Sequence, residues 1–136
     1  MNSRFVTAII ATGLLTIAVS GCSSSANTTA DQLVGTWTGT NAGYEGTDPV
    51  YVDKPLPVVV QEATGQAFLG YKEWTEPDGT AVDELITGAV TGAGQVTIVD
   101  EDGVFEGVLS GSSLSGTYVE NGDDRAVLEV ELTKGE

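Results

Sequence analysis

The chain is poor in the side chains that most enzymes and metal sites use. It has no histidine, one cysteine (Cys22) and only five lysine and arginine residues among 136. The lack of histidine excludes imidazole as a base, a proton shuttle or a metal ligand. A single cysteine excludes an internal disulfide. We therefore expect no catalytic residues, no bound metal and no cofactor.

Positive charge is also scarce. Twenty aspartate and glutamate residues give the chain a net charge of −15. Arg4 is the only basic residue before Cys22, so the chain from Cys22 onward has twenty acidic side chains and four basic ones. Such a surface repels phosphates and anionic lipid headgroups, which argues against nucleic acid as a partner.

The first residues have the pattern of an export signal. Arg4 precedes an uncharged, mostly apolar stretch over residues 5–19, which is shorter than the roughly 20 residues of a membrane-spanning helix. The stretch ends in Val19-Ser20-Gly21-Cys22, which resembles the lipobox of bacterial-type lipoproteins. The resemblance implies that residues 1–21 are a signal peptide that is removed, and that Cys22 carries lipid.

Lipidation at Cys22 implies where the protein works. Members of the lipobox family carry at least two acyl chains on this cysteine, and two chains anchor a protein stably. We expect a location at the cell membrane or envelope, facing outside the cytoplasm. Residues 22–31, which are rich in serine and threonine, are predicted to be a flexible tether.

Residues 32–136 are predicted to form one all-β domain. Short alternating runs of apolar and polar residues are separated by turn signals such as Asp-Gly and Asn-Gly. No apolar period of 3.6 residues is sustained, and only residues 29–34 suggest a short helical entry. The predicted strands cover residues 33–44, 56–63, 66–74, 80–90, 95–100, 104–110, 114–120 and 125–134.

Eight strands with short connections predict an antiparallel up-and-down barrel. A two-sheet β-sandwich is the alternative fold. Within the barrel, alternation predicts the core face of each strand. The predicted core residues are Ala126, Leu128, Val130, Leu132, Phe105, Leu109, Val96, Ile98, Leu114 and Tyr118. Residues 66–74 are ambiguous, because either Phe68 with Trp74 or Leu69 with Tyr71 fits the inner face.

The first strand opens with Gly35-Thr36-Trp37, which resembles the G-x-W start of calycins, the lipocalin-like and avidin-like barrels. The resemblance implies a closed barrel in which Gly35 and Trp37 have a structural role in closing one end. Strand glycines such as those in Gln66-Ala67-Phe68-Leu69-Gly70 also resemble those of small exported barrels. We interpret these glycines as room for aromatic rings on neighbouring strands.

Four aromatic residues are candidates for ligand binding. Tyr44, Tyr51, Tyr71 and Trp74 are predicted to line a mouth that binds a small apolar or amphipathic molecule. Residues 48–54 are predicted to be a loop, and the best candidate for a lid. The alternative is that these rings only pack the barrel, since eight strands can be filled by side chains.

Two acidic turns carry some of the residue types of a calcium loop. They are Asp100-Glu101-Asp102-Gly103 and Asn121-Gly122-Asp123-Asp124. Neither has the twelve-residue ligand pattern of an EF-hand, so we interpret both as hairpin turns.

Two functions follow from these patterns. The first is a lipid-anchored barrel that captures a small apolar or amphipathic ligand. The second is a non-catalytic structural or protein-interaction module displayed at the cell envelope, with a protein partner that the sequence does not identify.

Overall fold

A computed structural model describes residues 27–76 and 78–136 of the chain. The predicted signal peptide, Cys22 and most of the predicted tether lie outside the described residues. The described chain forms one short 3₁₀ helix and nine strands. They are η1 (Ala30–Gln32), β1 (Gly35–Glu45), β2 (Val50–Pro55), β3 (Val58–Thr64), β4 (Ala67–Thr75), β5 (Ala81–Val90), β6 (Gln95–Val99), β7 (Gly103–Ser110), β8 (Ser113–Glu120) and β9 (Ala126–Lys134).

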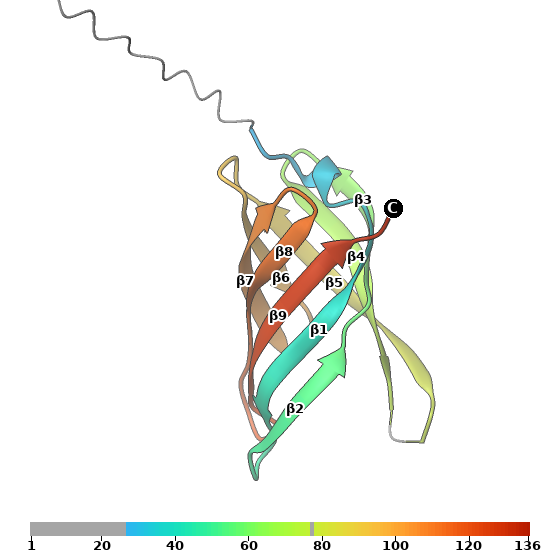
Figure 1. Cartoon of the computed structure of the whole chain (residues 1–136), viewed down its shortest axis with the longest axis vertical. Helices are drawn as coiled ribbons and strands as arrows, with labels where there is room; N and C mark the ends of the chain where they lie inside the picture. The colour runs from blue at the N-terminus through green and yellow to red at the C-terminus, as the bar shows by residue number, and fades with distance from the viewer. Residues whose placement is uncertain (1–26, 77) are drawn as a thin grey trace, which may run out of the picture.

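Eight of the strands close into an antiparallel barrel (Figure 1). The sheet runs β1-β3-β4-β5-β6-β7-β8-β9, and β9 pairs with β1 to complete the ring. Almost every strand pairs with its neighbour in sequence, because the turns are too short to permit crossovers. The predicted eight-stranded barrel is confirmed, and the single closed sheet rules out the sandwich.

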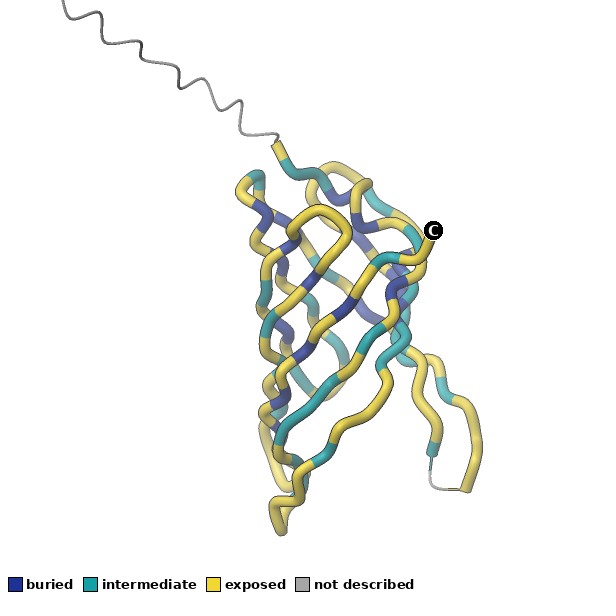
Figure 2. The backbone as a smooth tube through the Cα atoms, viewed as in Figure 1, coloured by how far each residue is buried: buried dark blue, intermediate teal, exposed yellow. Residues whose placement is uncertain are grey.

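The core follows the predicted alternation. Every second residue of β9, from Ala126 to Leu132, is buried. Of the other predicted core residues, four are buried, and Ile98 and Tyr118 are partly buried against the core cluster. Figure 2 shows the resulting pattern of buried and exposed residues alternating along the barrel strands.

The ambiguous fourth strand turns Phe68 inward. Phe68 is buried, whereas Leu69 is 38% exposed on the outer face. Phe68 stands directly opposite Gly88 on β5, where a β-carbon would overlap its ring. Phe105 covers Gly107 of its own strand, β7. Gly88 and Gly107 therefore make room for aromatic rings, whereas Gly70 lies against the backbone of β3.

One end of the barrel is filled by Trp37 and the segment that precedes β1. Trp37 is 1% exposed and its Nε1–H donates to the carbonyl of Leu33 at 2.7 Å. Ala30, the first residue of η1, and Leu33, which follows η1, are also buried in the core cluster. The described chain therefore begins at this closed end, where the Thr28 N–H donates to the Gly92 carbonyl (Figure 1).

The prediction of a loop over residues 48–54 was wrong. Residues Val50–Pro55 form β2, which pairs with the second half of β1 from Thr40 to Glu45. β1 has eleven residues but pairs with β3 only over Gly35–Trp37, so β2 supplies the hydrogen bonds that the rest of this edge needs. In the part of the chain that the structure describes, no helix is long and apolar enough to cross a membrane.

Candidate functional site

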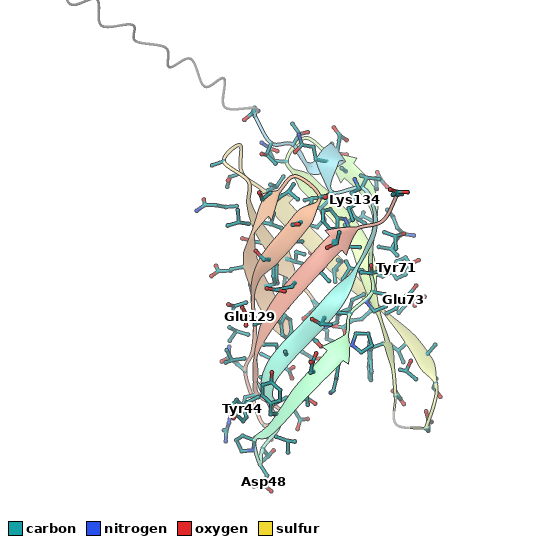
Figure 3. All side chains as sticks on the ribbon, in the orientation of Figure 1. Tyr44, Asp48, Tyr71, Glu73, Glu129 and Lys134 are labelled. Atoms are coloured by element: carbon teal, nitrogen blue, oxygen red, sulfur yellow. The ribbon has the colours of Figure 1, made fainter. Side chains whose placement is uncertain are left out.

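The barrel is split at the end opposite η1. β2 and β3 lie one after the other along the same edge of β1, but only β3 pairs with β4. Beyond Lys72, β4 leaves the barrel together with the first residues of β5 as a projecting hairpin (Figure 1). Figure 3 labels Glu73 at the point where this hairpin departs.

Two prolines explain where the split begins. The last hydrogen bond on this side of β4 runs from the Glu73 N–H to the carbonyl of Pro57, which directly precedes β3, at 3.0 Å. Pro57 has no N–H to return the bond, and Pro55, two residues earlier, lacks the N–H that would face the same edge. The ladder between β4 and the β2 side therefore ends at this point.

A cavity of about 70 Å³ lies inside the barrel, and the split begins at its wall. Leu56 and Lys72, on either side of the split, both line it. The volume is roughly five times what one water molecule needs on the same measure, and well below the roughly 300 Å³ of a typical drug-sized pocket. The remaining lining residues are Asn41, Val58, Ile86, Ile98, Asp100, Phe105, Leu114, Tyr118, Val130 and Leu132.

A polar network centred on Asp100 forms one side of the cavity. Lys72 Nζ lies 2.6 Å from Asp100 Oδ2 and 3.1 Å from Glu84 Oε2. The Tyr118 hydroxyl donates to Asp100 Oδ1 at 3.0 Å, and the Gly103 N–H donates to the same oxygen at 2.7 Å. The Asp100 side chain is only 4% exposed, so these bonds compensate for its burial.

The network shifts the pKa values of Lys72 and Asp100 in the directions that favour their charged forms. Burial alone would lower the pKa of Lys72, but Asp100 and Glu84 together raise it above its usual value. Burial alone would raise the pKa of Asp100, but Lys72, Gly103 and Tyr118 hold it below its usual range. Burial and the Asp100 charge raise the pKa of Tyr118. Lys72 and Asp100 are therefore charged, and Tyr118 is neutral, at neutral pH.

Asn41 provides an unpartnered polar atom in the cavity wall. Its Oδ1 is buried, and the described residues offer it no hydrogen-bond donor. Asn41 lies on the inward face of β1, directly opposite Val130 of β9. A buried acceptor without a donor costs about 1–3 kcal/mol. The atom is therefore a ready acceptor for a donor that enters the cavity.

The four aromatic candidates do not form one site, although two of them are in contact. Tyr44 and Tyr51 stack edge to face on the outer surface, with ring centroids 5.5 Å apart and exposures of 62% and 59%. Tyr71 lies on the outer face of β4 (Figure 3). Trp74 is on the inner face of the projecting hairpin, opposite Val82, and 43% exposed. The cavity lining includes none of the four.

Sequence reasoning missed Asn41, Lys72 and Asp100. Tyr118 was predicted to face inward, but as a core residue only. Lys72 is two strand positions from Gly70 and four from Phe68, so an inward Phe68 would have predicted an inward lysine. Asp100 was assigned to a turn, and its oxygen accepts the N–H groups of Asp102 and Gly103 as such turns do.

Within residues 27–76 and 78–136, no group of three histidine, cysteine, aspartate or glutamate side chains is placed to hold a metal ion. Comparison with known proteins adds no relative: the chain matches no protein-family model and no curated protein sequence.

Proposed function

We propose that this protein is a lipid-anchored envelope protein whose barrel captures a small amphipathic molecule in the cavity behind the split. The observation that carries the proposal is the buried Asn41 Oδ1, an acceptor without a donor in a mostly apolar wall. A ligand with an apolar body and one hydrogen-bond donor satisfies both features. The cavity volume limits the enclosed part of the ligand to a few heavy atoms.

The position of the tether supports this proposal. Asn27 lies at the η1 end of the barrel, and the split lies at the other end (Figure 1). An anchor on Cys22 would therefore attach the closed end to the membrane and leave the split end facing away from it. Molecules outside the cell would then reach the cavity without crossing the lipid surface.

The proposal is tested with two probes of similar size, phenol and toluene. We expect both to shift the backbone amide NMR signals of Ile86 and Phe105 in the purified domain, because part of each ring can enter the mostly apolar cavity. Phenol also donates a hydrogen bond, so Asn41→Leu weakens phenol binding by at least about fivefold and leaves toluene binding unchanged or tighter. Asn121→Leu, the same change at an exposed turn residue, is the matched control.

The opposite result would favour the second candidate. If neither probe shifts the cavity residues, or if Asn41→Leu weakens both probes equally, the cavity is not a site for a small donor. The small volume of the cavity would then fit a filled barrel that serves as a structural or protein-interaction module.

A further inference from the structure

β2 presents an unpaired backbone edge along the split. The Leu56 N–H donates to the Gly39 carbonyl of β1 at 2.9 Å. In an antiparallel pair, alternate residues turn their N–H and C=O groups to opposite edges, so Tyr51 and Asp53 turn theirs away from β1. Across the described chain, β2 pairs with no strand besides β1. The outward backbone groups of Tyr51 and Asp53 are therefore open to another strand.

The other side of the split is also incomplete. The Glu73 carbonyl receives no hydrogen bond from Pro57, because proline has no N–H. Thr75 lies beyond Lys72, the last residue of β4 that pairs with β3. Figure 1 shows β2 and the β4–β5 hairpin diverging from this point, and Figure 2 shows that both are exposed along most of their length.

The side chains beside the split differ between its two faces. On the inner face, Val50 is 61% exposed and Trp74 is 43% exposed. On the outer face, Asp53 is exposed, and Glu73 stands directly opposite Asp83. Like charges directly opposite each other are unfavourable. Among the described side chains, no lysine or arginine forms an ion pair with any of these three acids.

We propose that the free edge of β2 binds an extended segment of a partner protein in which apolar and basic residues alternate. The segment adds a strand antiparallel to β2. Its apolar side chains lie on the inner face beside Val50 and Val52, and its lysines or arginines lie on the outer face beside Asp53 and Glu73. This site uses none of the residues that line the small-molecule cavity.

A second copy of this chain is a poor occupant of the edge. Its strands carry the same negative charge, since the chain has twenty acidic and five basic residues. The edge of β2 is also short and ends in Lys54 and Pro55, which discourage pairing between identical edges. Complementary charge favours a basic partner instead.

The test uses a capped hexapeptide of alternating valine and lysine. It also uses two isomers of this peptide, one methylated on the backbone nitrogen of every lysine and the other on the backbone nitrogen of every valine. The isomers have equal mass, charge and apolarity, but in an antiparallel pair only the lysine N–H groups face β2. We expect calorimetry to show that lysine methylation weakens binding by about tenfold or more, while valine methylation changes it little. If valine methylation weakens binding and lysine methylation does not, the peptide adds to β2 in the parallel sense. Equal affinities for both isomers, or no binding of the parent peptide, would overturn the proposal.

Two variants of one residue test the edge on the protein side. Asp53→Ala and Asp53→Pro remove the same charge, but only proline removes the outward N–H. Because that N–H faces away from β1, we expect both variants to keep the barrel, which circular dichroism checks. We predict that Asp53→Pro binds the peptide about tenfold more weakly than Asp53→Ala. Equal binding by the two variants would mean that charge alone attracts the peptide, and would overturn the proposal.

Discussion

At the scale of single residues, Asp100 has the largest number of polar contacts in the cavity wall. Its carboxylate accepts from Lys72, Tyr118 and backbone N–H groups while being almost fully buried. We predict that Asp100→Asn lowers the free energy of unfolding by about 1–3 kcal/mol at pH 7, because Lys72 loses its closest counter-charge. Urea denaturation measures the change. Asp102→Asn, in the same turn but exposed, should change stability by less than about 0.5 kcal/mol.

The same carboxylate predicts a pH dependence. The pKa of Asp100 is lower in the folded state than its unfolded value of about 3.9. A lowered pKa stabilises the fold above the unfolded value, and the contribution is lost as pH falls through the folded pKa. The gap in stability between wild type and Asp100→Asn should therefore shrink below about pH 4. A gap that stays constant from pH 7 to pH 3 would contradict this assignment.

At the scale of elements, the prolines before β3 keep the split open. We predict that Pro57→Ala adds an N–H that donates to the Glu73 carbonyl and extends the β3–β4 ladder by one bond. Hydrogen exchange should then slow at the Glu73 amide by about tenfold, the effect of one further hydrogen bond. Pro49→Ala, in the turn before β2, is the control and should leave Glu73 unchanged. Unaltered exchange at Glu73 in Pro57→Ala would mean that the missing N–H does not limit the ladder.

The strands themselves were largely predictable, because their alternation and turns are local signals. The alternating face of β9 was read correctly from Ala126 to Leu132. β2 was missed, because two prolines and two aspartates within residues 48–55 indicate a loop. β2 forms because it pairs with the part of β1 that β3 leaves free. This is a tertiary interaction, and the local sequence carries no signal for it.

At the scale of the whole molecule, the closed barrel followed from the number of strands and the shortness of their connections. The cavity did not, because its shape depends on which residues meet across the barrel axis. A register shift between Val60 and Glu62, for example, leaves Gln61 without a partner on β4 and decides which later residues of β3 face inward. Asn41 and Lys72 could not be assigned to one site in advance, because they lie on β1 and β4, which are not neighbours in the sheet.

At the same scale, the start of the described chain and the split lie at opposite ends of the barrel. The described chain begins at the closed end, and the split, with the cavity behind it, is at the other end (Figure 1). If Cys22 is lipidated as we propose, the barrel is anchored by its closed end, and the cavity and the edge of β2 face away from the membrane.

Native mass spectrometry of the protein extracted from its own membrane, without denaturation, tests the central claim most directly. We predict a chain that begins at Cys22 with the covalent mass of lipid, together with a small additional mass that is lost when the protein is unfolded. The lost mass identifies the ligand that occupies the cavity. A chain that keeps residues 1–21, or a lipidated chain with no further mass under any growth condition, would contradict the proposal of a lipid-anchored ligand carrier.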